Sequence, residues 1–316
     1  MTPKKRRAAA SARAFAPGSV GNLGPGLDIL GLALAACGDR VEASWTQAQG
    51  IVIADPGHPS ISTDPDRNTA GLAAREVLRR AGHSGTGGLR LVVQKGLPIS
   101  GGQGGSAASA VAAAVAVNHL LGAPLGRMTL LEACLAAEEA VAGRHADNIA
   151  PSLFGGIVLI RSLEPPDLVQ LPVPHRLHVA LAHPHQQLRT MEGRAVLPGQ
   201  VSRDLAMYQA AQVAAMVAAL GAGDLRLLGR ALDDRIAEPA RAPLLPGFAE
   251  AKAAALEAGA LGGSISGSGP TAFALVNSEA AGERVAEAMA AAYRRRGVSC
   301  QTLVSKVDRK GARLES

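Results

Sequence analysis

The sequence predicts an α+β fold with two domains. Short β-branched segments and alanine-rich helical segments occur in both halves of the chain. Neither half has the strict strand–helix alternation of a doubly wound parallel sheet. The halves are separated by a proline-rich stretch, with four prolines between residues 165 and 174, which excludes a regular helix there. A chain of 316 residues can bury two modest cores.

The first half is predicted to begin with strands and to continue into helices. Its candidate strands are short, rich in β-branched or alternating residues and bounded by turn residues: 41–45, 50–54 and 89–95. Apolar residues recur at helical spacing over 68–82, where Gly82 ends the predicted helix. Two mostly apolar helices are predicted at 106–122 and 129–143. Helices of that composition are buried.

The second half is predicted to start with a strand at 176–184 and to be rich in helices. The predicted helices lie at about 204–220, 224–232, 246–260 and 280–297. Between the last two helices, residues 263–276 indicate a glycine turn that enters a buried strand. We therefore expect a basic tail at 1–13 and domains at 14–165 and 172–316.

The positive charge of the chain is concentrated at its start. The formal net charge is +6, and residues 1–13 carry five basic side chains and no acidic one, which leaves 6 − 5 = +1 for the rest. Aromatic residues make up only 2% of the chain, so it lacks a set of platforms on which bases would stack. We expect no nucleic-acid partner.

Cysteine usage and apolar runs indicate a cytoplasmic protein. Cys37, Cys134 and Cys300 are far apart and odd in number, which is typical of reduced thiols and not of a disulfide framework. Arg13 interrupts the weakly apolar start, which argues against a signal peptide. No uninterrupted apolar run approaches the ~20 residues that span a bilayer. We expect no membrane association.

A glycine-rich loop at 98–106 precedes the first apolar helix. It has no GxxxxGK[ST] pattern, which excludes a P-loop, and its GxGxxA match lacks the acidic residue of a dinucleotide site. Consecutive glycines let backbone N–H groups approach an anion, and the following helix adds its positive dipole end. Ser106 could cap the helix or bind phosphate or magnesium. A simple glycine hinge remains equally compatible with this stretch alone.

Three motifs in order resemble those of the GHMP small-molecule kinases. They are APGSVGNLGPGLDILGLAL at 16–34, PISGGQGGSAAS at 98–109 and GSISGSGPTAFAL at 263–275. Further segments resemble the homoserine kinase branch: HADNIAPSLFGGIVLI at 145–160, TMEGRAVLP at 190–198 and IAEPARAPLLPGF at 236–248. The resemblance covers about 14–276. It implies an N-terminal ribosomal-S5-like α/β domain with a left-handed crossover, and a C-terminal ferredoxin-like α+β domain.

The same resemblance implies the reaction and its partners. The γ-phosphoryl group of ATP would pass, with Mg²⁺, to the side-chain hydroxyl of L-homoserine, to give O-phospho-L-homoserine in threonine biosynthesis. The expected partners are therefore ATP and L-homoserine. The sequence does not determine the oligomeric state, and a homodimer is compatible with it.

The resemblance implies that the glycine-rich loop binds the phosphates of ATP. It also implies that a carboxylate on a later helix binds magnesium together with Ser106. The predicted ATP-binding residues are Pro98, Ser100, Gly101, Gly102, Gln103, Gly104, Gly105 and Ser106. By its distance along the chain from His145 we choose Glu138 as the carboxylate. Its neighbour Glu139 points about 100° away on a helix, so only one of the two can face the site.

For the acceptor end, Asn22 and Asp28 match the family's substrate-binding pair. An amino acid is a zwitterion, so its ammonium needs an acidic partner and its carboxylate a cationic one. Arg194 and Arg241 are the candidate cations, because a guanidinium grips a carboxylate in two places.

The segment HADN adds two further substrate residues, His145 and Asn148. Asn148 cannot take a proton at neutral pH, so we expect it to orient the hydroxyl, and no strong protein base to act. Asp147 as a general base is the alternative. The predicted catalytic residues are Asn148, Arg194 and Arg241.

The middle motif departs from the family's usual P-x-x-x-G-L-G-S-S-A. Gln103 stands in place of the leucine and Gly105 in place of the first serine. Three alternatives follow: another GHMP kinase with a different hydroxylated substrate, a non-catalytic homologue with a weakened ATP loop, and a dinucleotide-dependent oxidoreductase.

Overall fold

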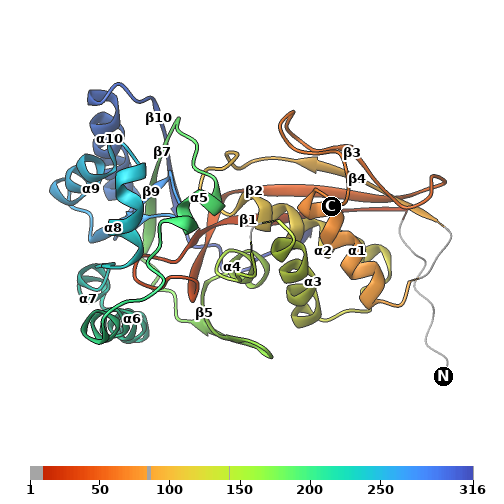
Figure 1. The fold of residues 1–316 in the computed structure, drawn as a ribbon, viewed down its shortest axis with the longest axis horizontal. Coiled ribbons are helices and arrows are strands. Elements are labelled where there is room, and N and C mark those ends of the chain that lie inside the picture. Colours follow the sequence, from red (N-terminus) through yellow and green to blue (C-terminus); the bar gives the residue numbers. More distant parts are fainter. Residues whose placement is uncertain (1–9, 84–86, 142, 316) are drawn as a thin grey trace.

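The computed structural model describes residues 10–83, 87–141 and 143–315. Within these ranges the chain forms a seven-stranded sheet and a four-stranded sheet, each covered by helices. In Figure 1 the larger sheet lies to the right with α1–α3, and the smaller sheet lies to the left with α8–α10. The predicted α+β architecture with two layered halves is confirmed.

The larger sheet has the strand order β11-β1-β2-β4-β3, with β5 and β6 branching from the start of β2. Its pairings are antiparallel, except that β3 runs parallel to β4. Its strands are β1 (Ser11–Gly21), β2 (Leu30–Thr46), β3 (Ile51–Asp55), β4 (Gly88–Gln94), β5 (Ile157–Leu163), β6 (Pro166–Leu171) and β11 (Arg313–Glu315).

The first motif of the sequence forms β1, a turn and the start of β2. Sequence reasoning found only the end of β2, because the small residues of β1 and early β2 show no alternation of apolar and polar side chains. The predicted basic tail at 1–13 extends too far, because its last residues, 11–13, belong to β1. Arg13 lies in β1 and its Nη2 donates a hydrogen bond to Gln94 Oε1 at 2.7 Å. The basic residues Lys4, Lys5, Arg6 and Arg7 lie outside the described residues.

The helices of the first half pack on one another and on β1 and β2. They are α1 (Thr69–Arg80), α2 (Gly105–Leu120), α3 (Arg127–Glu139) and α4 (Ile149–Phe154). The three predicted helices are confirmed, although α3 ends before the Gly143 that was expected to stop it. Alanines on every side of α2 are buried, because the small side chains let the helix lie close to the sheet and to both neighbouring helices.

The smaller sheet is antiparallel with the order β10-β7-β9-β8. Its strands are β7 (His178–Pro184), β8 (Gly262–Ile265), β9 (Ala272–Val276) and β10 (Cys300–Lys306). The helices of this half are α5 (Thr190–Ala195), α6 (Arg203–Ala222), α7 (Leu225–Arg230), α8 (Ala237–Arg241), the 3₁₀ turn η1 (Ala242–Leu244), α9 (Phe248–Glu257) and α10 (Glu279–Arg295). This strand order, with helices after the first and third strands, is the expected ferredoxin-like arrangement.

The two halves share a core. Leu30, Leu32 and Leu34 of β2 lie in one buried cluster with Leu181 of β7 and Phe273 of β9. Met216 and Leu220 of α6 belong to the same cluster. A common core of this kind sets the position of the first motif relative to the second sheet.

Helix α6 is long and apolar enough, by length and composition alone, to cross a bilayer, although it contains no uninterrupted apolar run of that length. It has 20 residues, and its most apolar window has a mean hydropathy of 1.4 with 22% of that window buried. It is the one such helix in the part of the chain that the structure describes. The sequence shows Gln209 and Gln212 interrupting its apolar side chains, so the uninterrupted-run criterion passed over it.

The proline-rich segment between the predicted domains is not a plain linker. It contains β6, which pairs with β5, and the chain ends with β11 in the first sheet after crossing the second. The strands β6 and β11 form by pairing with β5 and β1, which are separate segments of the chain. The composition of β6 or β11 alone does not reveal these pairings. The division into 14–165 and 172–316 remains a prediction.

Candidate active site

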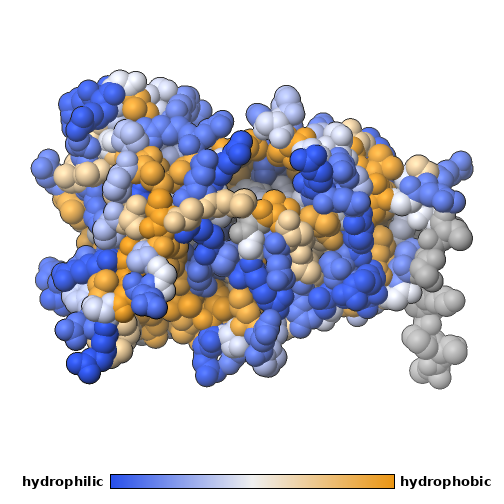
Figure 2. Space-filling model, in the orientation of Figure 1, coloured by the Kyte–Doolittle hydropathy of each residue, from blue (hydrophilic) through white to orange (hydrophobic). Residues whose placement is uncertain are grey.

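A cavity of about 540 Å³ lies where the two halves meet, and it gathers most of the predicted site residues. Figure 2 shows the surface hollowed in this central region. The lining includes Asn22, Glu138, His145, Asn148, Arg194, Arg241 and the loop residues Pro98, Ser100, Gly101, Gly102, Gly104, Gly105 and Ser106. Two predicted residues do not line it: Asp28, which contacts Arg194 at its edge, and Gln103, which is buried beneath the loop.

The glycine loop needs glycine at two positions where the chain runs close to other segments. A Cβ at Gly102 would lie 2.4 Å from the carbonyl oxygen of Ser266, and one at Gly104 would lie 2.2 Å from Ser19 Oγ. Both residues have a positive φ, 73° and 68°, that disfavours other residues. Helix α2 begins directly afterwards, so backbone N–H groups and the positive end of the dipole face the cavity.

Gly105, where the family has a serine, is less constrained. The nearest atom to a Cβ there is Lys95 Nζ at 3.3 Å, the far end of a flexible side chain. The geometry of the loop is therefore compatible with either residue at this position.

A lysine beneath the loop, with 9% of its side chain exposed, was missed by sequence reasoning. Lys95 Nζ donates hydrogen bonds to the carbonyl oxygen of Gly105 at 2.9 Å and to Ser109 Oγ at 3.0 Å, and it forms an ion pair with the buried Asp39. Lys95 also lines the cavity and places a positive charge under the start of α2. Its position just after β4 and before the loop was the available signal.

Gln103 connects the loop to the second half of the molecule. Its side chain is 4% exposed, and Nε2 donates a hydrogen bond to Thr271 Oγ1 at 3.2 Å. The Thr271 hydroxyl in turn donates to the carbonyl oxygen of Gly101. The polar residue in place of leucine is thus buried with a hydrogen-bond partner.

The predicted magnesium ligands lie together. Ser106 Oγ donates a hydrogen bond to Glu138 Oε1 at 2.8 Å, and Glu138 Oε2 is buried without a hydrogen-bond partner among the described residues. Burial raises the pKa of the Glu138 carboxyl. Glu139 points elsewhere, 3.2 Å from a guanidinium nitrogen of Arg144. An orphaned carboxylate oxygen beside a hydroxyl fits a hard divalent cation.

In the described ranges, no group of three or more His, Cys, Asp or Glu side chains is placed so that it could hold a metal ion. Mg²⁺ is usually held by one or two carboxylates together with substrate phosphates and water, so the Ser106–Glu138 pair is sufficient for that mode of binding.

At one end of the cavity the basic side chains of Arg194 and His145 line the space, and the acidic Asp28 contacts both of them from its edge. Arg194 Nη1 lies 3.3 Å from Asp28 Oδ2, and His145 Nδ1 lies 3.5 Å from Asp28 Oδ1. Asn22 Oδ1 accepts a hydrogen bond from the Asp28 backbone N–H at 3.0 Å. Asn22 and Asp28 both have a positive φ, which these two residue types tolerate best after glycine. Burial lowers the pKa of His145, so its imidazole is neutral at pH 7.

Arg241 is the most buried of the site cations, with 2% of its surface exposed. Its Nε donates to the carbonyl oxygen of Gly193 at 2.8 Å, and its Nη1 donates to that of Gly267 at 2.9 Å. Asn22 Nδ2 donates to the same Gly267 oxygen at 3.0 Å. Burial lowers the pKa of the guanidinium, although arginine stays protonated in proteins.

Asn148 and Asp147 lie between the two ends of the cavity. Asn148 Oδ1 accepts a hydrogen bond at 2.9 Å from Ser19 Oγ, a second residue that sequence reasoning missed. Asp147 Oδ2 accepts one from the Asn22 backbone N–H at 3.1 Å. Burial first, and then the nearby Asp28 charge, raise the pKa of Asp147 to about 7. The interpretation of Asp147 as a general base therefore stays open.

Comparisons with known proteins agree with this arrangement. The family model described as GHMP kinases N terminal domain matches residues 68–156, and the one described as GHMP kinases C terminal matches residues 216–295. A homoserine kinase from Chloroherpeton thalassium is 41% identical over 95% of this chain and 98% of its own length. One from Arabidopsis thaliana is 44% identical over 96% of this chain and 84% of its own.

A solved structure extends the similarity to the whole fold. The crystal structure of homoserine kinase from Cytophaga hutchinsonii superposes with a TM-score of 0.93, at 37% identity, over 98% of this chain and 99% of the other. Sequence, fold and the two domain matches agree over nearly the full length. The chain therefore belongs to the homoserine kinase family of the GHMP kinases.

Proposed function

We propose that this chain is an ATP-dependent kinase that phosphorylates the side-chain hydroxyl of L-homoserine, to give O-phospho-L-homoserine and ADP in threonine biosynthesis. Relatives named homoserine kinase, about 40% identical over most of the chain, support the assignment. The observation that carries it is the arrangement of the cavity. A glycine-rich anion cradle, Arg194 and Arg241 line one space, and the Asp28 carboxylate pairs with Arg194 at its edge, so charges suited to an amino acid lie beside the cradle.

At the nucleotide end, the loop residues from Pro98 to Ser106 would bind the phosphates of ATP. Their backbone N–H groups, the dipole of α2 and the Lys95 ammonium all favour negative charge there. Ser106 Oγ and Glu138 would hold Mg²⁺, which when bound neutralises charge on the phosphates.

At the acceptor end, the charges match the two ends of a free amino acid. The Asp28 carboxylate, with His145 beside it, would bind the ammonium group, and Arg194 and Arg241 would bind the carboxylate. Asn22 would hold Asp28 in place through their hydrogen bond.

Asn148 would orient the hydroxyl that is phosphorylated. Its amide is fixed by Ser19 and cannot accept a proton at neutral pH. Phosphoryl transfer passes through a loose transition state, so alignment and charge neutralisation contribute more than a strong base.

We also propose that the enzyme acts in the cytoplasm on these two small molecules, without a nucleic-acid or membrane partner. The small charge of the chain beyond residue 13 and the shared identity with biosynthetic kinases support this. A homodimer remains a prediction that the hydrodynamic size of the purified protein would test.

The proposal is tested by ADP release from Mg-ATP with L-homoserine, L-threonine, L-serine, mevalonate or galactose as acceptor. We expect turnover with L-homoserine, lost in Arg241→Ala and retained in Arg230→Ala, which changes an exposed arginine on α7. Turnover with mevalonate or galactose alone would replace the substrate and keep the reaction class. Folded protein without turnover on any acceptor would favour the non-catalytic homologue.

A further inference from the structure

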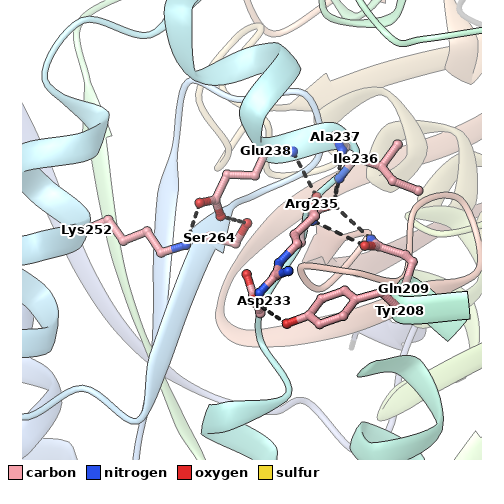
Figure 3. A network of polar contacts seen from close by, with 10 residues as sticks. Tyr208, Gln209, Asp233, Arg235, Ile236, Ala237, Glu238, Lys252 and Ser264 are labelled. Atoms are coloured by element: carbon pink, nitrogen blue, oxygen red, sulfur yellow. Dashed lines mark hydrogen bonds and ion pairs between the residues drawn. The ribbon is translucent and has the colours of Figure 1, made fainter. Parts of the chain in front are cut away.

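A network of polar contacts outside the cavity surrounds the start of α8 and includes Gln209 of α6 (Figure 3). Its centre is Asp234, which is 6% exposed. The carboxylate accepts hydrogen bonds from the backbone N–H groups of Ile236, Ala237 and Glu238 at 2.9, 3.0 and 2.9 Å. These donors are the residue before α8 and its first two residues, and the last residue of α8 is Arg241.

Gln209 of α6 completes this network and extends it to the first half of the chain. Its Nε2 donates to Asp234 Oδ1 at 2.8 Å and to the carbonyl oxygen of Pro25 at 2.9 Å, and its Oε1 accepts from the Arg235 backbone N–H at 3.2 Å. The residue is 7% exposed. Pro25 lies in the turn between Asn22 and Asp28, so one buried amide contacts both acceptor segments.

The spacing of these segments matters for the chemistry of the acceptor. The ammonium and carboxylate groups of an amino acid are attached to one carbon, so their partners must be held at a fixed separation. Asp28 belongs to the first half of the chain and Arg241 to the second. Among the described residues, the Gly267 carbonyl, shared by Asn22 and Arg241, is one link between them, and the Gln209 amide is another.

We propose that Gln209, together with Asp234, is a positioning residue that sets the distance between Asp28 and Arg241 and thereby the affinity for an α-amino acid acceptor. This inference rests on the proposed function. Gln209 does not line the cavity, so it acts through the segments that it contacts.

The rest of the network supports α8 from its other sides. Glu238 forms an ion pair with Lys252 of α9 and accepts a hydrogen bond from Ser264 Oγ of β8 at 2.6 Å. Asp234 is also among the carboxylates whose charge opposes the pKa-lowering effect of burial on Arg241. The contact to Pro25 is the part of this network that reaches the first half, which makes Gln209 the residue to change.

The test is Gln209→Leu, which keeps the approximate size of the side chain and removes its amide. Loss of hydrogen bonds to a charged group and to a carbonyl is expected to raise KM for L-homoserine about ten-fold or more. KM for Mg-ATP is expected to stay within about two-fold, because no hydrogen bond or ion pair joins the glycine loop at 98–106 to the side chains of Gln209 or Asp234. Gln212→Leu, on the same helix and only partly buried, is the matched control and should change neither constant.

Gln209→Glu separates positioning from a general loosening of the fold. Its carboxylate would lack both N–H donors and face Asp234 at pH 8, whereas protonation at lower pH would restore one donor. We expect its KM for L-homoserine, relative to the wild type, to fall as the pH is lowered from about 8 to about 6.

Three outcomes would overturn the inference. One is an unchanged KM for L-homoserine in Gln209→Leu. Another is an equal rise in both KM values with a lower melting temperature, which would indicate only destabilisation. The third is a wild-type enzyme that does not use L-homoserine, which would remove the proposed function as well and is recognised before any variant is compared.

Discussion

Asp28 and Arg194 form an ion pair at the edge of the cavity, with Arg194 Nη1 3.3 Å from Asp28 Oδ2. Asp28 follows the first strand, and Arg194 lies in α5 of the second half, so the pair bridges the two halves of the molecule. Arg194 Nε is buried and has no hydrogen-bond partner among the described residues. A zwitterion that binds between these groups would replace the Asp28–Arg194 ion pair with two, one from its ammonium to Asp28 and one from its carboxylate to Arg194. A neutral sugar could form neither, so the site suits a free amino acid better.

The first prediction concerns Asp28→Asn, which removes the charge opposite the ammonium group. Charge-assisted hydrogen bonds contribute about 1.5–3 kcal/mol, so KM for L-homoserine should rise about 10- to 100-fold while KM for Mg-ATP changes little. Steady-state kinetics with each substrate varied in turn measures this. Asp204→Asn is the control, because that side chain is 94% exposed. An unchanged KM for L-homoserine in Asp28→Asn would rule out the ammonium role.

The second prediction compares the neighbouring glutamates of α3. Glu138→Gln should lower kcat about 100-fold or more and raise the Mg²⁺ concentration needed for half-maximal activity, because a neutral amide is a weaker ligand for a hard cation. Glu139→Gln should remain near the wild type, since Glu139 contacts Arg144 and not Ser106. Mg²⁺ titrations of both variants measure the difference. Equal losses in the two variants would contradict the assignment of Glu138.

The third prediction follows from the pKa of Asp147, which burial raises from 3.8 to about 7. Between these values the folded protein holds a proton that the unfolded chain has lost, so this group's contribution to the free energy of unfolding decreases as the pH rises from about 4 to about 7. Asp147→Asn has no carboxyl at this position and should not show that decrease. The free energy of unfolding of the variant minus that of the wild type should therefore be larger at pH 8 than at pH 5. Denaturant unfolding at both pH values measures the effect.

The same variant bears on the mechanism. If Asn148 orients the hydroxyl and no strong base acts, Asp147→Asn should keep kcat within about ten-fold. A loss of more than 1,000-fold, in folded protein with normal Mg-ATP binding, would make Asp147 the general base instead.

The fourth prediction concerns two adjacent glycines of the loop. Gly104→Ala places a Cβ 2.2 Å from Ser19 Oγ at a positive φ, so it should destabilise the fold by about 1–3 kcal/mol and raise KM for Mg-ATP about ten-fold. Gly105→Ala is the control, because Gly105 has no positive φ and the nearest atom to its Cβ would be Lys95 Nζ at 3.3 Å, so this variant should bind Mg-ATP within about two-fold of the wild type. Thermal unfolding and ATP kinetics measure both. Equal behaviour of the two variants would show that the cradle does not depend on the close approach at Gly104.

The parts of the fold that local sequence controls were predictable. The helices α1 and α10 follow apolar spacing, α2 follows its almost wholly apolar composition, and end signals lie within the segments themselves. The glycine run predicted a tight loop before α2, and the positive φ values of Gly102 and Gly104 agree with it. Strand β1 was missed, because its alanines and glycines carry no period that distinguishes a buried strand from a loop.

The site residues also divide into those that the sequence motifs identified and those that only the structure revealed. The motifs identified Asn22, Asp28, Arg194 and Arg241, but Lys95 and Ser19 were missed. The place of Lys95 between a predicted strand and the glycine loop was a signal that went unused, whereas a single serine carries no pattern that distinguishes a site residue from a surface one. The choice between Glu138 and Glu139 was made from chain distance alone, whereas the structure separates them by their partners.

The sequence by itself determined the order of the three motifs and the helices α1, α2, α3, α6, α7, α9 and α10, since each depends on residue types at short spacing, whereas the short helices α4, α5 and α8 were not predicted. Only the tertiary structure decided which distant groups meet: β11 beside β1, Gln103 against Thr271, and Gln209 between Pro25 and Asp234. The physical reason is that these partners lie far apart along the chain. Their hydrogen bonds form when the shared core brings the two halves together, and no short segment records that pairing.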